Sequence, residues 1–476
     1  MNTLDTFLKS AYAKWRDNDY LHQSGRTETY GSFTEKVNYF AACLREKGFA
    51  GKNIGIFSPN SIEWMIADIA IMNYVGVSVG LSKDWKYDDL LYALKKCDIA
   101  CLLYSEVNAE MIGAAKSVFP EVAFICVEKE FESCVAEGKV LCAELFTLPT
   151  KTDGEAAKIV MTSGSTSFPK AVLLSIKNIF SGWESLQRRI HVTEEDICYL
   201  FLPLSHTYGS IYNFIYSLVF GFRIYLAENI KTMAQEMGAI RPTLFSAVPI
   251  VFIKFLEGAK QYGIPVKMLL GGRIKYLFCG GADLTLELRN SYIQQGLYLM
   301  NAYALSETAS AFSLDYPGDS VLDSVGTLFE NLDAKVIAPG EDGYGELAVK
   351  GDNVFIGYYN DEEATRAVFD SEGYFRTGDI GCIKDKHVYV RGRKDTMIVL
   401  PNGENVSSNA LVQKIKQTEP SIRSVKLYVR DNALTADIYS SAQLDWDSLI
   451  EALNNTLPKY ERIRKYNIVD PSLLLK

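Results

Sequence analysis

The sequence predicts an α/β protein with a large N-terminal domain of helix-covered, mostly parallel sheets and a small barrel-like region, followed by a small α+β domain. Helical periodicity alternates with short β-branched runs through the first half, and beyond about Gly343 short strands and glycine turns take over. The 476 residues also exceed the roughly 250 to 300 that one hydrophobic core supports. We therefore expect two domains, residues 1–394 and 395–476.

The first half repeats a helix-then-strand order. SFTEKVNYFAACLREKG precedes KNIGIFSP, SIEWMIADIAIMNYVG precedes VSVGLS, and YDDLLYALKKC precedes IACLLYS. Such alternation predicts parallel strands covered by helices. The most apolar segment, residues 210–227, is interrupted by Asn213 and Arg223 and barely reaches bilayer-spanning length. We expect a buried helix running into a strand there, and no transmembrane segment.

Charge and cysteine usage exclude several classes of function. The formal net charge of -9 without a basic block argues against a nucleic-acid-binding protein. The nine cysteines are scattered without the spacing of a zinc site, so we expect reduced core residues. The N-terminal twenty residues carry charges too often for a signal peptide, and we expect a cytoplasmic protein.

The strongest chemical signal is the segment IVMTSGSTSFPKAVLLS, residues 159–175, where an apolar strand runs into a loop of Ser, Thr and Gly ending in Pro-Lys. Small residues let backbone N–H groups approach phosphate oxygens, and the lysine adds a positive charge. It is not a Walker A loop, because Pro169 precedes the lysine and Ala171 follows it. The loop indicates a polyphosphate site of another type, although alone it also fits a solvated serine-rich turn.

Five further segments follow this loop in order: LPLSHTYG, GGADL, NAYALSETA, YFRTGDIG and RGRKDTMIVLPNGENV. Together they resemble the ANL superfamily of adenylating enzymes, which includes acyl-CoA and aryl-CoA synthetases, adenylation domains of peptide synthetases and luciferases. The resemblance covers nearly the whole chain and is nearest to long-chain acyl-CoA synthetases. It implies that ATP activates a carboxylic acid as its acyl-adenylate and that the acyl group then passes to a thiol.

The resemblance also implies the catalytic residues. Lys170 is similar to the lysine of the phosphate loop, and Glu307 to the carboxylate that binds Mg²⁺, a hard cation that prefers oxygen ligands. His206, in LPLSHTYG, is similar to the residue that lines the carboxylate site near the phosphates; as a lone histidine it also fits a structural role. Asp395 occupies the family's hinge position.

The same resemblance implies the nucleotide-binding residues. Tyr303 resembles the aromatic residue that stacks on adenine, and Ser306 the hydroxyl that touches the α-phosphate. Asp379 resembles the carboxylate that accepts from both ribose hydroxyls, and Arg393 the arginine that reaches the ribose or phosphate. The remaining expected contacts are the loop residues Thr162, Ser163, Gly164, Ser165 and Thr166, together with Gly281, Ala282, Asn301 and Ala302.

The substrates implied by the resemblance are a fatty or aryl acid and either CoA or the phosphopantetheine of an acyl carrier protein. The segments that build the family's acid pocket, IRPTLFSAVPIVFIKFLEG and KYLFCGGADL, are rich in apolar residues. The family's C-terminal Pro-x-x-x-x-Gly-Lys segment is altered, because Lys476 lies five residues after Pro471 without the glycine. Either Lys476 replaces the family's lysine or that lysine is absent, and a catalytically weak nucleotide-binding regulatory protein is the alternative of another class.

Overall fold

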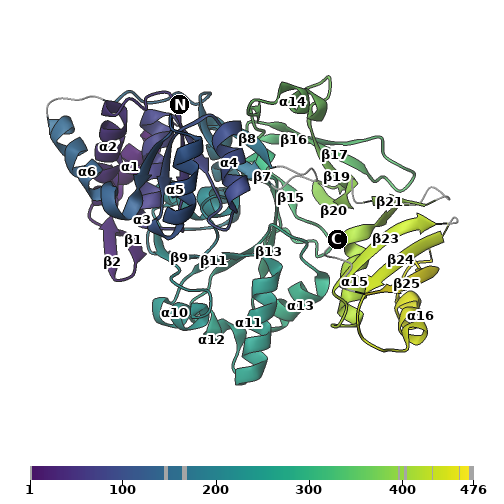
Figure 1. Cartoon of the computed structure of the whole chain (residues 1–476). Coiled ribbons are helices and arrows are strands. Elements are labelled where there is room, and N and C mark those ends of the chain that lie inside the picture. Colours follow the sequence, from purple (N-terminus) through teal and green to yellow (C-terminus); the bar gives the residue numbers. More distant parts are fainter. Residues whose placement is uncertain are drawn as a thin grey trace. The chain divides into compact units, whose positions relative to one another are not determined.

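The structure is a computed structural model that describes residues 3–143, 148–162, 169–394, 397–400, 405–430, 433–459 and 461–470 (Figure 1). The chain divides into two compact units. Unit 1 is Met1–Ala334, Val349–Phe375 and Asp385–Val388, and unit 2 is Lys335–Ala348, Arg376–Lys384 and Tyr389–Lys476. The domain boundary expected after residue 394 stays a prediction, since unit 2 also takes in two earlier segments.

Unit 1 contains a seven-stranded sheet of order β18-β8-β7-β4-β3-β5-β6. Its strands are β3 (Asn53–Phe57), β4 (Val77–Gly80), β5 (Ile99–Tyr104), β6 (Ala123–Cys126), β7 (Ala156–Thr162), β8 (Lys170–Ser175) and β18 (Gly357–Tyr358). The helices before and between β3 and β7 are α2 (Tyr30–Glu46), α3 (Ile62–Ala70), the π-helix η1 (Ile71–Val75), α4 (Tyr87–Lys96), η2 (Glu106–Asn108), α5 (Ala109–Val118) and α6 (Val127–Ala143). The strands β3 to β7 pair in parallel, which confirms the predicted alternation, and β8 pairs antiparallel with β7 and β18.

A second run of strands in unit 1 has the order β15-β14-β13-β12-β11-β9-β10-β1-β2. They are β1 (Asp19–Gln23), β2 (Arg26–Thr29), β9 (Ile197–Leu200), β10 (Arg223–Leu226), β11 (Leu244–Ala247), β12 (Tyr276–Cys279), β13 (Leu299–Ala304), β14 (Ala311–Leu314) and β15 (Thr327–Leu328). From β1 to β13 neighbouring strands pair in parallel, while β2, β14 and β15 join antiparallel.

The remaining helices of unit 1 lie around these two sets of strands. They are α1 (Leu4–Trp15), α7 (Ile176–Phe180), α8 (Trp183–Arg189), the π-helix η3 (Tyr208–Ile215), α9 (Ser217–Phe220), α10 (Met233–Ile240), α11 (Pro249–Tyr262), α12 (Val266–Leu269), α13 (Leu286–Gln294), η4 (Ser306–Thr308) and α14 (Glu362–Val368). The segment predicted as a buried helix and strand, residues 210–227, is η3, α9 and β10, which confirms that prediction. No described helix has both the length and the apolar character needed to cross a bilayer.

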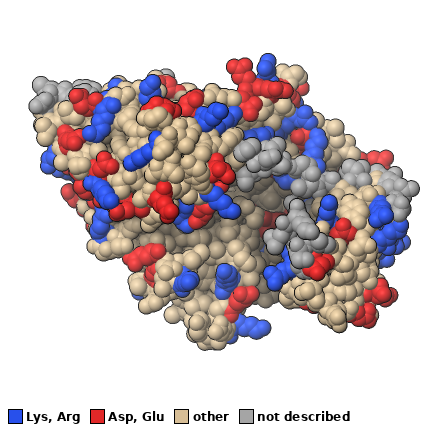
Figure 2. Space-filling view, viewed as in Figure 1, with Lys and Arg blue, Asp and Glu red and all other residues tan. Residues whose placement is uncertain are grey.

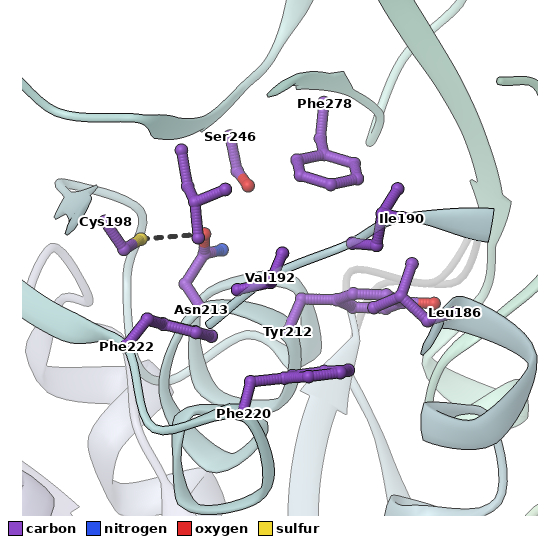
Figure 3. A pocket seen from close by; sticks show the side chains of 11 residues that line it. Leu186, Ile190, Val192, Cys198, Tyr212, Asn213, Phe220, Phe222, Ser246 and Phe278 are labelled. Carbon is purple, nitrogen blue, oxygen red and sulfur yellow. Dashed lines mark hydrogen bonds between the residues drawn. The ribbon is translucent and has the colours of Figure 1, made fainter. Parts of the chain in front are cut away.

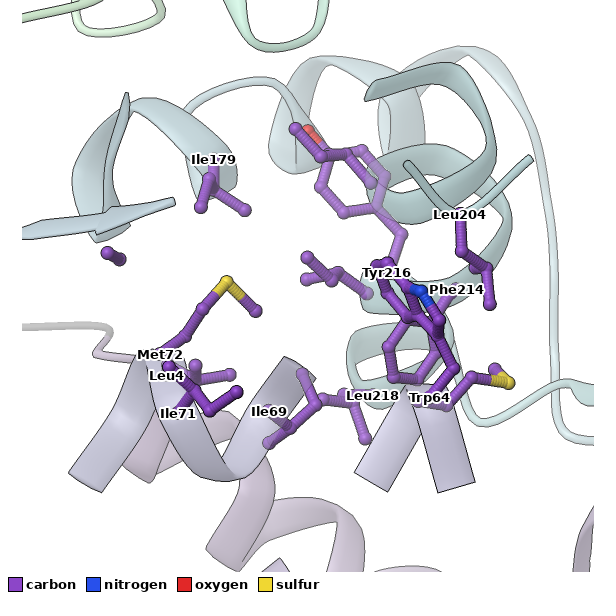
Figure 4. Packing of buried hydrophobic residues seen from close by; sticks show 14 of the residues in the cluster. Leu4, Trp64, Ile69, Ile71, Met72, Ile179, Leu204, Phe214, Tyr216 and Leu218 are labelled. Atoms are coloured by element: carbon purple, nitrogen blue, oxygen red, sulfur yellow. The ribbon is translucent and has the colours of Figure 1, made fainter. Parts of the chain in front are cut away.

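One hydrophobic core connects the two sets of strands within unit 1. Trp64 of α3 and Met72 of η1 belong to the same buried cluster as Phe214 of η3 and Leu218 of α9, and Figure 4 shows these side chains gathered together. The central strand β3 reads NIGIF and is buried at every position, as expected of a strand covered on both faces. All nine cysteines are free and eight of them are buried, which agrees with the predicted core role.

Unit 2 carries most of three strands and a separate α+β region. Its elements are the end of β16 (Leu332–Ile337), most of β17 (Gly345–Gly351), β19 (Phe375–Lys384) and β20 (His387–Arg393), the pair β21 (Met397–Val399) and β22 (Asn405–Ser407), α15 (Ser408–Thr418), β23 (Ser424–Arg430), β24 (Ala433–Tyr439), α16 (Trp446–Thr456) and β25 (Lys465–Val469). Leu411, Ile415, Ile438 and Ile450 share its core. The predicted helix followed by two strands corresponds to α15, β23 and β24.

A fully buried ion pair joins β7 to α3. The Nζ atom of Lys158 donates to both carboxylate oxygens of Asp68 at 2.7 Å, and neither side chain has exposed surface. The hydroxyl of Ser78 also donates to Asp68, and the indole ring of Trp64 lies 5.1 Å from the ammonium. Buried charges are tolerated only when paired and hydrogen-bonded, so these contacts fix β7 against α3.

We expect Lys158→Met to lower the free energy of unfolding by about 3–5 kcal/mol, because it leaves the Asp68 carboxylate buried without its partner. The double variant Lys158→Met/Asp68→Leu removes both charges and should recover most of that loss. Urea unfolding followed by circular dichroism measures both. Lys177→Met is the matched control, since the 2.7 Å Lys177–Asp352 pair is exposed and is worth at most about 1 kcal/mol. An equal loss in the control would contradict the role of burial.

Candidate functional site

Three parallel strands end side by side at one edge of unit 1. Ala247 of β11 pairs with Cys279 of β12, and Cys279 pairs with Asn301 of β13. Open α/β sheets bind ligands beyond the carboxyl ends of their strands. Five predicted residues belong to this edge, because Gly281 and Ala282 follow β12 directly and Asn301, Ala302 and Tyr303 lie on β13.

The backbone approaches closely at this edge. A Cβ atom on Gly280 would lie 3.2 Å from the carbonyl oxygen of Ala302 and 3.6 Å from the ring of Tyr208, so a side chain there would crowd both. The ring of Tyr303 packs against Phe312 with centroids 4.5 Å apart. The strand edge therefore offers an aromatic face, with glycine where β12 turns away.

The predicted lysine and the predicted carboxylate are connected through a tyrosine. The Nζ atom of Lys170, at the start of β8, lies 4.7 Å from the ring centroid of Tyr358. The hydroxyl of Tyr358 donates to Oε1 of Glu307 at 2.9 Å. Tyr358 reaches this position because β18 pairs with β8, opposite Val172. Lys170 thus lies over the ring of Tyr358 while Glu307 accepts from its hydroxyl, and sequence reasoning missed this tyrosine.

Lys170 is the first residue of β8, directly after the loop that connects β7 to β8. Thr162, the last residue of β7, pairs directly with Lys170, and its hydroxyl donates to the Lys170 carbonyl at 3.5 Å. The two strands therefore deliver Thr162 and Lys170 to the same end of the sheet. Among the other predicted residues, Ser163, Gly164, Ser165, Thr166, Asp395 and Lys476 lie outside the described residues.

Glu307 sits in a short 3-10 turn whose backbone is held from both sides. The N–H of Leu305 donates to the hydroxyl of Thr308 at 3.0 Å, and the N–H of Phe355 donates to the Glu307 carbonyl at 2.8 Å. Ser306 opens the turn, so its hydroxyl is adjacent in sequence to the carboxylate. The described residues contain no group of three or more His, Cys, Asp or Glu side chains that could hold a metal. A Mg²⁺ ion that keeps several waters and phosphate ligands needs only one or two carboxylates, and Glu307 fits that need.

His206 lies in the segment between β9 and η3. Its side chain is exposed, yet the surrounding protein atoms desolvate the imidazole enough to lower its pKa below the usual value. His206 is therefore neutral at pH 7, and it remains available to a ligand.

Unit 2 brings two further predicted residues together. The guanidinium of Arg393 on β20 donates to the Thr377 carbonyl at 2.8 Å and lies 3.5 Å from a carboxylate oxygen of Asp379 on β19. Gly378 has φ +72°, and a Cβ atom there would lie 3.0 Å from the guanidinium. Only glycine combines that backbone conformation with that close approach. The RTGD motif thus places the Asp379 carboxylate beside Arg393.

An apolar cavity of about 30 Å³ lies against strands β9, β11 and β12 of unit 1 (Figure 3). Its lining is Leu186, Ile190, Val192, Cys198, Tyr212, Asn213, Phe220, Phe222, Leu244, Ser246 and Phe278. Tyr208 adjoins the lining residue Phe278, since its hydroxyl donates to the Phe278 carbonyl at 2.9 Å, and its ring lies 3.6 Å from where a Cβ atom on Gly280 would be. Leu244, Ser246 and Phe278 come from the segments named by sequence. The contribution of residues 186–198 was missed, because nothing local in that stretch marks a pocket.

A family model and curated relatives each match most of this chain. A family model described as AMP-binding enzyme matches residues 8–359. The chain is 24% identical to long-chain-fatty-acid–CoA ligase 5 of Rattus norvegicus over 88% of this chain and 71% of that protein. It is 25% identical to the medium-chain fatty-acid–CoA ligase of Escherichia coli (strain K12) over 84% and 73%.

Solved structures show the same fold. ATP-bound MatB from Rhodopseudomonas palustris superposes with a TM-score of 0.84 at 21% identity, covering 98% of this chain and 95% of that one. The O-succinylbenzoate coenzyme A synthetase MenE from Bacillus subtilis in complex with AMP gives a TM-score of 0.81 at 21% identity, covering 98% and 94%. These likenesses confirm the predicted α/β architecture.

Proposed function

The chain belongs to the AMP-binding enzyme family, and we propose that it is an AMP-forming acid–thiol ligase that uses ATP to activate a carboxylic acid and then transfers the acyl group to CoA. The observation that carries this proposal is the contact series Lys170–Tyr358–Glu307, beside the base of the β7–β8 hairpin. A positive charge and a metal-binding carboxylate held by one ring suit a polyphosphate substrate. The two curated relatives described above are fatty-acid–CoA ligases.

The reaction needs negative charge to be neutralised. An oxygen of the substrate carboxylate attacks the α-phosphorus of ATP, the bond to the β-phosphate oxygen breaks, and pyrophosphate leaves. We propose that Lys170 neutralises the charge on the phosphate oxygens. Hydrogen bonds to these oxygens would come from Thr162 and the loop residues Ser163, Gly164, Ser165 and Thr166. Glu307 would hold Mg²⁺, which adds positive charge at the phosphates when bound.

The remaining predicted residues receive the nucleotide and the acid. We assign adenine stacking to Tyr303 and an α-phosphate contact to Ser306, with the backbone of Gly281, Ala282, Asn301 and Ala302 around the base. Asp379 presents two carboxylate oxygens for two ribose hydroxyls, and the adjacent Arg393 holds that carboxylate in place. Neutral His206 would face the acid's carboxylate without adding charge.

The acid we propose has an apolar tail, fatty or aryl. The cavity in Figure 3 is lined mainly by aliphatic and aromatic side chains, and Ser246 and Asn213 are its polar members. As it stands, the cavity has room for about one or two water molecules. A long tail would therefore have to displace Tyr208 or Tyr212, whereas a short or flat tail would displace less.

Lys170→Ala and Glu307→Ala should each reduce ATP–pyrophosphate exchange by at least about 100-fold, because each removes one preorganised charge from the reacting phosphates. Both side chains lie at the edge of unit 1, so circular dichroism and the melting temperature should stay near those of the parent protein. Lys177→Ala is the matched control, because this exposed lysine on α7 pairs with Asp352. Full exchange in either site variant would refute the assignment.

Tyr358→Phe should raise the Mg²⁺ concentration needed for half-maximal exchange by about tenfold or more. A group that orients a metal ligand typically contributes 10- to 100-fold to metal affinity. The phenyl ring still lies under Lys170, while the hydrogen bond to Glu307 is lost. A Mg²⁺ titration measures the shift. Tyr359→Phe is the control, since the neighbouring hydroxyl donates to Asp98 instead. Equal titrations for both variants would exclude Tyr358 as a positioning residue.

A pyrophosphate-release screen over acids of varied length and aromaticity tests the proposed function as a whole. We expect release with apolar acids, and thioester formation when CoA is supplied. Replacing CoA by a phosphopantetheinylated carrier protein tests the alternative acceptor. Release without thioester on CoA would favour the carrier protein, and release at background level with every acid would favour a regulatory nucleotide-binding protein.

A further inference from the structure

Unit 1 exposes several apolar side chains along α11 and the turn that leads into α12. Among the described residues, fifteen large hydrophobic side chains are exposed, and five of them fall within residues 250–268. These five are Ile250, Ile253, Tyr262, Ile264 and Met268, and the exposed fractions of Tyr262 and Met268 are 68% and 60%. Scattered exposed apolar residues are ordinary, whereas a local concentration such as Tyr262, Ile264 and Met268 is a candidate interaction surface.

The backbone that presents this surface is anchored. The opposite face of α11 buries Phe252 and Phe255 in a core cluster, and Val266 and Leu270 of the next turn are buried in the same cluster. Gly263 ends α11 in the left-handed conformation, φ +65°, and turns the chain into α12. Tyr262, Ile264 and Met268 are therefore displayed by a packed scaffold.

The same stretch is basic, unlike the protein as a whole. Between residues 250 and 273 the charged residues are Lys254, Lys260, Lys267 and Arg273 with one acid, Glu257, in a chain of net charge -9. All four basic side chains are exposed, and none forms an ion pair with another described residue. Figure 2 shows blue side chains beside tan surface at the lower edge, where α11 and α12 lie in Figure 1.

We propose that this surface, the α11–α12 surface, docks the protein onto an anionic lipid bilayer. It consists of the five exposed apolar side chains and the four exposed basic side chains of residues 250–273. Apolar side chains insert below the headgroups, tyrosine suits the boundary region, and lysine and arginine pair with anionic headgroups. Each basic side chain near such a membrane strengthens binding by about fivefold.

The charges favour a lipid over a second copy of this chain as the occupant. In a two-fold dimer the same patch meets itself, so the basic side chains of one copy would face those of the other. Like charges across an interface oppose association. An anionic bilayer offers an apolar interior to the exposed apolar side chains and negative charge to the basic ones.

The proposal adds a site to the proposed ligase and does not depend on it. None of the residues changed in its test is assigned to ATP, metal or acid. Docking would place unit 1 at the membrane, into which acids with apolar tails partition. The two ideas can fail separately, since vesicle binding is measured without ATP and exchange is measured without vesicles.

Cosedimentation of the full chain with vesicles tests the docking. One set of vesicles is phosphatidylcholine alone, and the other contains phosphatidylglycerol as well. We expect binding to the anionic vesicles that weakens as salt is raised. Tyr262→Ser/Ile264→Ser/Met268→Ser should weaken binding at least tenfold. Lys260→Gln/Lys267→Gln/Arg273→Gln should weaken it on the order of a hundredfold, at about fivefold per charge.

The control variant is Val107→Ser/Val118→Ser/Val140→Ser, which removes three exposed apolar side chains elsewhere in unit 1. It should bind vesicles as the parent does, and all variants should keep the melting temperature and the exchange rate in solution. Equal binding to both vesicle types, no binding at all, or the same loss in the control would overturn the proposal. A dimer in light scattering that the triple serine variant abolishes, without vesicle binding, would assign the surface to a second copy.

Discussion

A lysine ammonium without exposed surface fixes the strand on which the site depends. Lys158 is stable inside unit 1 because both oxygens of Asp68 accept from it, so β7 cannot slide along α3 without leaving two charges unpaired. Four residues later β7 ends at Thr162, which pairs with Lys170. The position of Lys170 therefore depends on a buried ion pair of the preceding strand.

From that strand the site is assembled by successive neighbours. β8 follows β7 and sets Lys170, β18 follows β8 and sets Tyr358, and the phenol of Tyr358 holds Glu307. Glu307 comes from a turn after β13, a strand of the other sheet arrangement in unit 1. The hydrophobic core between the two sets of strands holds these elements in place, so packing away from Lys170 and Glu307 determines where these two charges lie.

The sequence predicted much of this arrangement where the signal was local. The sequence indicates Lys170, Glu307 and Asp379 as candidate site residues because each belongs to a motif that is visible within a few residues. Tyr358 could not be found in that way, because it meets Glu307 only through strand pairing between distant segments. Sequence analysis also missed the part of the cavity wall that residues 186–198 form, because these residues have the apolar pattern of ordinary core positions.

The π-helical form of η3 has an evolutionary consequence. A π turn holds one residue more than an α turn, and such turns recur at functional sites. Removing a single residue from η3 would let this segment close as an ordinary α-helix and would change which side chain occupies the position of Tyr212 in the cavity wall. A one-codon deletion, rather than a series of substitutions, would then be a short route by which descendants of this chain acquire a differently shaped cavity.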